Sequence, residues 1–284
     1  MAAVPSSPAS NPTGRTVLDK LLARQRAIVM GILNLTPDSF SDGGQFVDPR
    51  AAIAHAASMV RQGADIIDVG AESTRPYDGM QPITFEEECA RLAPSLPDVI
   101  KLGRPVSIDT MKARMAAWAI ELGAAIVNDV WGLQRDPDMA RVVAEHGVPV
   151  IVMHNRLQAD AGIDIVADVT AFFQRSLDIA DTAGIPRNHI VLDPGIGFGK
   201  TPEQSIRVVA QLHRFKSFGL PLLVGLSRKR FISSIVPSEP NERLGGSIAG
   251  HLLAVNGGAS IVRTHDVAET VQALRVAQAI RSAE

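Results

Sequence analysis

The sequence is short of the features that mark several classes of protein. Cys89 is the only cysteine among 284 residues, so no disulfide can form within the chain and a reducing, cytoplasmic location is expected. Aromatic residues make up 4% of the chain and the net charge is −2, which argues against a nucleic-acid partner. No apolar run has the length of a bilayer span, so no membrane partner is expected. The composition favours a soluble enzyme or binding protein that acts on small molecules.

Motifs of common hydrolases are also missing. The sequence has no H-E-x-x-H pair, which argues against a zinc hydrolase, and no G-x-S-x-G elbow. Cys89 lies in the acidic stretch "TFEEECARLAP" and is expected to be a small packing residue. Residues 1–14, "MAAVPSSPASNPTG", have neither a basic nor an apolar segment, and they predict a disordered tail rather than a signal peptide. Residues 15–284 are then expected to form a single domain.

A regular alternation of strand and helix patterns runs through those residues. Continuous Val/Ile/Leu runs predict parallel strands that are buried on both faces, at residues 27–34, 65–73, 105–110, 124–129, 148–155, 189–195, 220–229 and 259–265. Amphipathic stretches such as "PRAAIAHAASMVRQG", "DPDMARVVAEHG" and "TPEQSIRVVAQLHRF" lie between them. Several of the predicted helices end in glycine, at Gly63, Gly123, Gly147 and Gly184.

Eight such alternations in a chain of this length predict an α/β fold, the eightfold (β/α)8 or TIM barrel. The alternative is an open, doubly wound sheet, which concentrates its ligand groups at one switch point. Here every predicted strand ends in a polar or charged group, as expected at the mouth of a barrel, so the pattern favours the barrel over the open sheet. These groups are Asn34, Ser73, Asp109, Asn128 with Asp129, His154 with Asn155, Asp193, Ser227 with Lys229, and Arg263 with His265.

The polar strand ends divide into an acidic half and a basic half. Asp109, Asn128 and Asp193 each suit a helix cap or a turn when taken alone. Together they offer acceptors for a flat heterocycle that carries several N–H donors. The basic half contains Lys229, Arg263 and His265, which are expected to gather positive charge where barrels often bind phosphate. Their neighbours Arg228 and Arg230 are expected to face solvent.

Two long segments follow the first and second predicted strands and predict loops that close over the mouth. In "GILNLTPDSFSDGG", Asn34 offers an amide oxygen of the kind that Mg²⁺ accepts. Asp38, Ser39, Ser41 and Asp42 follow it, either as further ligands or as solvated turn residues. The second segment, "AESTRPYDGMQPIT", carries Thr74 and Arg75.

The stretch "DPGIGFGKT" (193–201) ends like a nucleotide-binding P-loop, but Pro194 stands where that motif has its first glycine. Asp193 beside it would also repel a phosphate. We therefore expect a turn that leaves the sixth strand, with Asp193 directed at the ligand and Lys200 pointing to solvent.

These segments together resemble the dihydropteroate synthase family of pterin-binding barrels. The matching stretches are "GILNLTPDSFSDGG", "GADIIDVGAESTRP", "SIDT", "NDV", "DPGIGFGK", "SRK" and "RTHDV", in the family's order between residues 28 and 267. The resemblance implies a TIM barrel and a transferase of folate biosynthesis (EC 2.5.1.15). The family condenses 6-hydroxymethyl-7,8-dihydropterin diphosphate with p-aminobenzoate, which gives 7,8-dihydropteroate and diphosphate. It also implies Mg²⁺ as cofactor and a homodimer.

The resemblance also assigns roles to residues of this chain. It places the pterin on Asp109, Asn128, Asp193 and Lys229, with Met153 lining the slot. Asn34 becomes the Mg²⁺-linked residue, and Arg263 and His265 the diphosphate ligands. The p-aminobenzoate side is assigned to Thr74, Arg75 and Pro76 together with Phe198, Ser227 and Lys229. The expected catalytic residues are Asn34, Thr74, Arg75, Asp109, Asp193 and Lys229.

Two other functions fit part of this pattern. A pterin-binding methyltransferase barrel would share the Asp/Asn/Asp grip, yet it has no need of Asn34 or of the pair Arg263 and His265. A catalytically silent paralogue that only binds pterin would be expected to have lost Asn34, Lys229 or one of the long loops, and this chain has them all.

Overall fold

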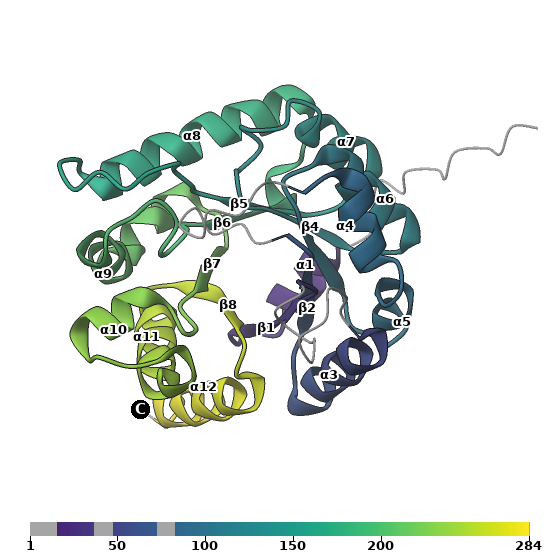
Figure 1. Cartoon of the computed structure of the whole chain (residues 1–284). Coiled ribbons are helices and arrows are strands. Elements are labelled where there is room, and N and C mark those ends of the chain that lie inside the picture. Colours follow the sequence, from purple (N-terminus) through teal and green to yellow (C-terminus); the bar gives the residue numbers. More distant parts are fainter. Residues whose placement is uncertain (1–15, 37–47, 73–82, 284) are drawn as a thin grey trace, which may run out of the picture.

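The protein, seen in a computed structural model, is a closed barrel of eight parallel strands (Figure 1), described for residues 16–36, 48–72 and 83–283. The strands are hydrogen-bonded in chain order from β1 to β8, and β8 pairs with β1. The predicted barrel is therefore confirmed over the open sheet. The strands are β1 (Ile28–Asn34), β2 (Ile66–Gly70), β3 (Val106–Asp109), β4 (Ile126–Asp129), β5 (Val150–Met153), β6 (Ile190–Asp193), β7 (Leu222–Gly225) and β8 (Ala259–Thr264).

Apart from α1 (Val17–Leu22), the helices form a ring outside the strands (Figure 1). The α-helices are α1 (Val17–Leu22), α3 (Pro49–Gln62), α4 (Phe85–Leu92), α5 (Leu96–Ile100), α6 (Ala113–Leu122), α7 (Met139–His146), α8 (Ile165–Ala183), α9 (Pro202–Ala210), α10 (Arg230–Ile235), α11 (Leu244–Asn256) and α12 (Val267–Arg281). Short 3₁₀ turns are η1 (Arg187–His189), η2 (Leu212–Phe218) and η3 (Pro240–Glu242). In the part of the chain that the structure describes, no helix is long and apolar enough to cross a membrane.

Glycine ends the predicted helices as expected. Gly63, Gly123, Gly147 and Gly184 all adopt left-handed backbone conformations directly after α3, α6, α7 and α8. The helix predicted through "TPEQSIRVVAQLHRF" is shorter than its pattern, because α9 ends at Ala210 and the chain continues as the 3₁₀ turn η2. The predicted tail, residues 1–14, lies outside the described residues.

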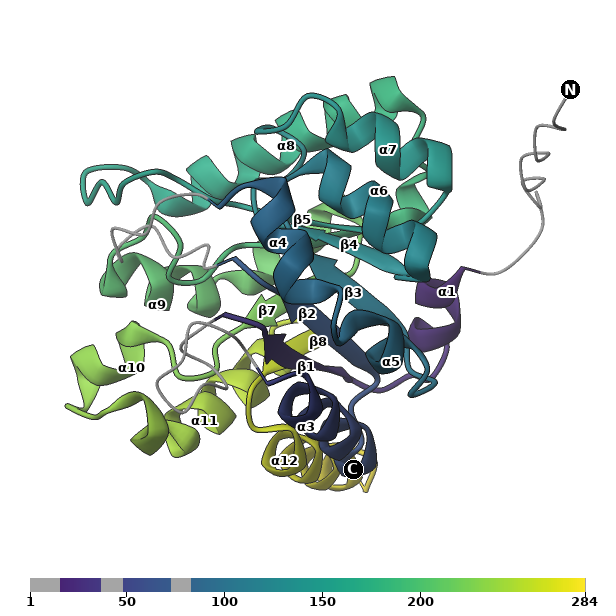
Figure 2. The same ribbon diagram turned by 45° about the vertical axis from the view of Figure 1, so that its right-hand side comes forward.

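Two apolar layers hold the barrel. The larger lies between the strands and the ring of helices, and Cys89 packs against it as predicted. The smaller fills the inside of the barrel near the beginnings of the strands, with Ile66, Ile126 and Ile261 among its members. Leu18 and Leu21 of α1 belong to this inner layer, so α1 covers the amino-terminal end of the barrel. Figure 2 shows α1 apart from the outer ring, at one end of the strands. The polar strand ends gather at the opposite end.

Candidate active site

The strand register brings the predicted polar residues to one rim. Asp109 at the end of β3 pairs with Asn128 of β4, and Met153 of β5 pairs with Asp193 of β6. Arg263 of β8 pairs with Gly225 of β7. Because parallel strands all end on the same side of a barrel, these residues share its mouth. The prediction that they meet there is confirmed.

Asp68, which the sequence analysis missed, lies at the centre of the acidic half. It is fully buried in β2, and its Oδ2 atom accepts hydrogen bonds from Arg263 Nε at 2.6 Å and from Asn128 Nδ2 at 3.1 Å. Arg263 Nη2 donates to Asp109 Oδ2 at 2.8 Å. Arg263 therefore bridges two carboxylates across the barrel. A single carboxylate inside the apolar run "IIDVG" was the available sequence signal.

Several buried acceptors at this rim have no partner among the described residues. They are Asp68 Oδ1, Asp109 Oδ1 and Asn128 Oδ1. An unpaired buried acceptor costs about 1–3 kcal/mol, so three at one mouth are not expected in a site that only supports the fold. They fit a ligand that brings N–H donors.

Two carboxyl groups at the rim, those of Asp109 and Asp193, have pKa values that are raised well above the ordinary value. Burial raises the pKa of Asp109 to about 7, opposed by Arg263 and reinforced by Asp68. Burial also raises the pKa of Asp193 to about 6, opposed by the hydrogen bond from the Gly195 amide and by Lys229. Asp109 and Asp193 thus lie near Arg263, and Asp193 also lies near Lys229 and Lys200, while Asp68 pairs with Arg263. A ligand that becomes more positive would be stabilised in such surroundings.

The turn after Asp193 is packed directly against the end of β5. Gly195 has φ +62°, and a Cβ atom added to it would lie 1.9 Å from the His154 carbonyl oxygen. Its amide donates to Asp193 Oδ1 at 2.8 Å, which orients that carboxylate. Further along the turn, Lys229 Nζ lies 4.1 Å from the centre of the Phe198 ring, an arrangement that favours a cation–π contact. The turn therefore places Asp193 and Phe198 on the side of the site that faces Lys229.

Ser227 and His265 form a pair on the basic side. Ser227 Oγ lies 3.0 Å from His265 Nδ1 and accepts the His265 amide at 3.2 Å. Burial, with the charges of Arg263 and Arg228, lowers the pKa of His265 to about 3. The expectation of positive charge on His265 is therefore wrong, since the imidazole is neutral near pH 7. The positive charge on this side comes from Lys229 and Arg263, and Arg263 donates to the carboxylates of both Asp68 and Asp109.

Arg228 does not simply face solvent, contrary to prediction. Its Nε atom donates to Asp266 at 3.2 Å, and its amide donates to Ser247 Oγ at 2.9 Å. Arg243 Nη1 donates to the Arg228 carbonyl at 3.0 Å. These contacts hold Arg228 in a left-handed conformation, φ +59°, between Ser227 and Lys229. Arg230 is exposed as expected.

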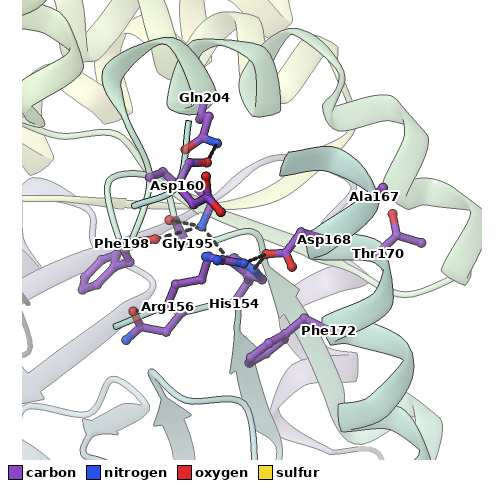
Figure 3. Close-up of polar contacts among 12 residues, drawn as sticks. His154, Arg156, Asp160, Ala167, Asp168, Thr170, Phe172, Gly195, Phe198 and Gln204 are labelled. Atoms are coloured by element: carbon purple, nitrogen blue, oxygen red, sulfur yellow. Dashed lines mark hydrogen bonds and ion pairs between the residues drawn. The ribbon is translucent and has the colours of Figure 1, made fainter. Parts of the chain in front are cut away.

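Lys200 was also predicted to face solvent, and this is wrong. The residue is 4% exposed, and its Nζ atom lies 2.6 Å from His154 Nδ1 and 2.8 Å from the Gly195 carbonyl oxygen. The glycines of "GIGFGK" let the chain fold back over its own lysine, which turns the side chain inward. Figure 3 shows His154 beside Asp168, with Gly195 and Phe198 on the other side of His154.

Residues at the base of the second loop were missed by the sequence analysis. Lys112 pairs with Glu72 and donates to Glu88 Oε2 at 2.8 Å. Glu72 Oε1 accepts the Ile83 amide at 3.2 Å. This cluster ties together the two described ends of the segment that carries Thr74, Arg75 and Pro76, which themselves lie outside the described residues.

Asn34 ends β1 beside Gly70 of β2, as predicted, and is half-buried at the rim. Asp38, Ser39, Ser41 and Asp42 lie outside the described residues. Within the described ranges, no group of three or more His, Cys, Asp or Glu side chains forms a metal site. Asn34 is therefore the described residue to which a Mg²⁺ role is assigned, and that role stays a prediction.

Known proteins share both the sequence and the fold of this chain. The pattern of the family described as "pterin binding enzyme" matches residues 30–265. A dihydropteroate synthase of Bacillus subtilis is 43% identical over 258 residues, which cover 90% of each chain. The Xanthomonas albilineans dihydropteroate synthase, solved with 4-aminobenzoic acid, superposes with a TM-score of 0.86 at 42% identity and covers 90% of this chain and 94% of its own. The same enzyme in complex with 7,8-dihydropteroate gives 0.83 at 40% identity, with the same coverage.

The closed barrel and its acidic, amide-bearing mouth thus define a pterin-binding enzyme. Within that class, the chain belongs to the dihydropteroate synthase family, whose members are transferases of a pterinylmethyl group in folate biosynthesis. The resemblance that the sequence motifs carried is confirmed.

Proposed function

We propose that this protein joins 6-hydroxymethyl-7,8-dihydropterin diphosphate to p-aminobenzoate and releases diphosphate and 7,8-dihydropteroate. The observation that carries the proposal is the set of buried acceptors on Asp68, Asp109 and Asn128 that have no partner among the described residues of the rim. An amino-pyrimidinone edge brings the N–H donors that such acceptors need. Related enzymes of Xanthomonas albilineans bind 4-aminobenzoic acid and 7,8-dihydropteroate.

In this proposal the pterin lies across the barrel mouth. Asp193 and Asp109 accept from its ring nitrogens, Asn128 both accepts and donates, and Met153 forms an apolar wall beside Asp193. Lys229 covers the opposite side, near the Phe198 ring. Charge-assisted hydrogen bonds of this kind are about twice as strong as neutral ones, so the carboxylates fix the orientation of the ring.

The chemistry begins with cleavage of the bond between the pterin methylene carbon and the diphosphate oxygen. The electron pair leaves with the diphosphate, and the positive charge spreads into the pterin ring. Asp193 and Asp109 stabilise this charge, because carboxylates at the ring nitrogens interact more strongly as the ring becomes positive. Arg263 offers donors to the departing phosphates, and neutral His265 offers an N–H.

The neutral amine of p-aminobenzoate then attacks the methylene carbon. A C–N bond forms, and the nitrogen releases a proton to solvent. The carbocation is reactive enough that no strong general base is required. We assign the p-aminobenzoate side to Phe198, Ser227 and Lys229, together with Thr74, Arg75 and Pro76.

We also propose Mg²⁺ as cofactor, held by Asn34. Mg²⁺ keeps several water ligands and is often bound through one or two protein oxygens plus substrate phosphates. A half-buried amide at the end of β1 fits that requirement. When bound, the ion would neutralise charge on the diphosphate.

We propose that the protein acts as a homodimer. Among the described residues, six large apolar side chains are more than half exposed; one is Leu157, and the other five lie at the end of α10 and on α11 and α12. These five are Ile235 and Val236 (63% and 62% exposed), Leu253 (65%), Val276 (55%) and Ile280 (63%). Large apolar patches on a protein surface commonly mark an interface. Light scattering should give the mass of two chains for the wild type and of one chain for Leu253→Lys. We further propose a cytoplasmic location, which the single cysteine supports.

The proposed reaction is tested by incubating the purified protein with Mg²⁺ and the pterin diphosphate, with and without p-aminobenzoate. We expect diphosphate and dihydropteroate to form in equal amounts only when both substrates are present. Pterin binding without diphosphate release would instead support a methyltransferase barrel or a silent pterin-binding protein.

A further inference from the structure

The environment of Lys200 is organised around one buried ammonium group. Nζ donates to the carbonyl oxygens of Gly195 at 2.8 Å and of Phe198 at 3.1 Å. It also lies 2.6 Å from His154 Nδ1. A buried lysine is expensive unless acceptors surround it, and here they come from the active-site turn and from the end of β5.

His154 is held so that it can only accept from Lys200. Its Nε2 atom lies 3.0 Å from Asp168 Oδ2, and a carboxylate can only accept, so Nε2 carries the hydrogen and Nδ1 the lone pair. Arg156 Nη1 donates to the same Asp168 oxygen at 2.9 Å. The Phe172 ring packs edge-on against the imidazole, with 4.9 Å between ring centres. Figure 3 shows His154 and Arg156 both directed at Asp168. Burial and the charge of Lys200 lower the pKa of His154 to about 4, so it stays neutral.

The two carbonyl groups that Lys200 holds belong to residues that shape the site. The Gly195 amide orients Asp193, as its 2.8 Å hydrogen bond shows. The Phe198 ring lies beneath the Lys229 ammonium. Gly199 is also tightly packed, because a Cβ atom there would lie 2.4 Å from Arg156 Cβ. The turn thus packs against the residues that follow β5, and Lys200 donates hydrogen bonds to two carbonyl groups of the same turn.

We propose that Lys200 is a positioning residue, which acts through the Gly195 and Phe198 carbonyls and is itself held by His154 and Asp168. It keeps Asp193 and the Phe198 ring in place for the two substrates. The inference deepens the proposed function, since it rests on the roles assigned there to Asp193 and Phe198.

This arrangement makes the site sensitive to pH. Burial lowers the pKa of Lys200 to about 7; Asp193 and Asp168 raise it, while Lys229 and Arg156 lower it further. Neutral His154 adds an acceptor without charge. An ammonium has three N–H groups for these three acceptors, whereas a neutral amine has only two. One acceptor therefore loses its partner as the pH rises, and the turn is held less firmly.

The first test replaces the ammonium. Lys200→Met should lower kcat/KM by between about 10-fold and 100-fold, because small misplacements of binding groups cost that much. It should also remove the part of the alkaline decline in kcat/KM that comes from Lys200. Lys101→Met is the matched control, since Lys101 is 74% exposed and pairs with the surface carboxylate of Asp98 in α5. That variant should keep the wild-type profile.

The second test leaves Lys200 in place and works even if Lys200→Met fails to fold. Asp168→Asn removes the negative charge that supports the lysine through His154, so the alkaline decline should move to lower pH by about half a unit or more. Asp181→Asn is the control, because Asp181 lies in the same helix and pairs with Arg187 at the surface. An alkaline limb that stays in place in Asp168→Asn would overturn the proposal.

Failure of the proposed role of Lys200 can be distinguished from failure of the proposed pterin site. If Asp193→Asn binds pterin as tightly as the wild type, the assignment of Asp193 fails, whatever Lys200 does. If Asp193→Asn weakens pterin binding while Asp168→Asn leaves the pH profile unchanged, only the role of Lys200 is wrong.

Discussion

Replacing Gly195 by alanine should destabilise the protein far more than the same change at a glycine with the same backbone angle. Gly195 has φ +62°, and its added Cβ atom would meet the His154 carbonyl oxygen at 1.9 Å. Gly147 has φ +63°, and nothing lies within 4 Å of its added Cβ atom. The pair therefore separates backbone strain from close packing.

The magnitudes follow from these two environments. Left-handed backbone costs alanine about 1–2 kcal/mol, and this is the whole expected effect of Gly147→Ala. Gly195→Ala must also push apart two backbone segments, since real Cβ contacts essentially never fall under 3.0 Å. Overpacking of this kind adds roughly 1–3 kcal/mol. At about 2–4 °C per kcal/mol, we expect Tm to fall by about 4 °C for Gly147→Ala and by about 10 °C for Gly195→Ala.

Thermal unfolding followed by calorimetry measures both variants under one condition, and pterin affinity is measured on the folded protein. Gly195→Ala should also weaken pterin binding, because the Gly195 amide orients Asp193, while Gly147→Ala should leave binding unchanged. Equal Tm values for the two variants would refute the close packing of the turn against β5.

Two further predictions concern charge at the rim. Arg263→Met leaves Asp68 and Asp109 buried without their shared cation, so it should lower the free energy of unfolding, measured with denaturant, by about 3–5 kcal/mol. The double variant with Asp68→Asn should recover part of that loss. No recovery would contradict the ion pair between Arg263 and Asp68. Pterin affinity should rise as the pH increases from about 5 to about 7, because the Asp193 carboxyl, with a pKa of about 6, must lose its proton to accept from the ligand. Titration calorimetry across that pH range measures the affinity. An affinity that does not change with pH would argue against an ionised Asp193 as the acceptor.

The fold was largely predictable from the sequence because its signals are local. Apolar runs with polar ends, and glycines after amphipathic stretches, specify strands and helix ends without reference to distant residues. The meeting of Asp109, Asn128 and Asp193 at one mouth follows from strand direction alone. What remained hidden were contacts between residues distant in the sequence, such as Arg263 with Asp68, which are 195 positions apart.

Lys200 shows why such contacts escape sequence analysis. A lysine after a glycine-rich turn ordinarily faces water, because burying an ammonium is costly. Only the folded chain shows that His154 and two carbonyl groups surround it. Asp68 was missed for a related reason, since a carboxylate within a strand has no pattern that names its partner. His265 was placed correctly, but its neutral state depends on burial and on charges from other strands.

The proposed function requires the carboxylate of Asp193 to bind the pterin at the barrel mouth. Its most direct test is the pterin affinity of Asp193→Asn, an almost isosteric change, beside Asp181→Asn at the surface of α8. We expect the Asp193 variant to bind about 10-fold or more weakly, because it loses a charge-assisted acceptor worth about 1.5–3 kcal/mol. The Asp181 variant should bind like the wild type. Unchanged affinity in Asp193→Asn would contradict the proposed site.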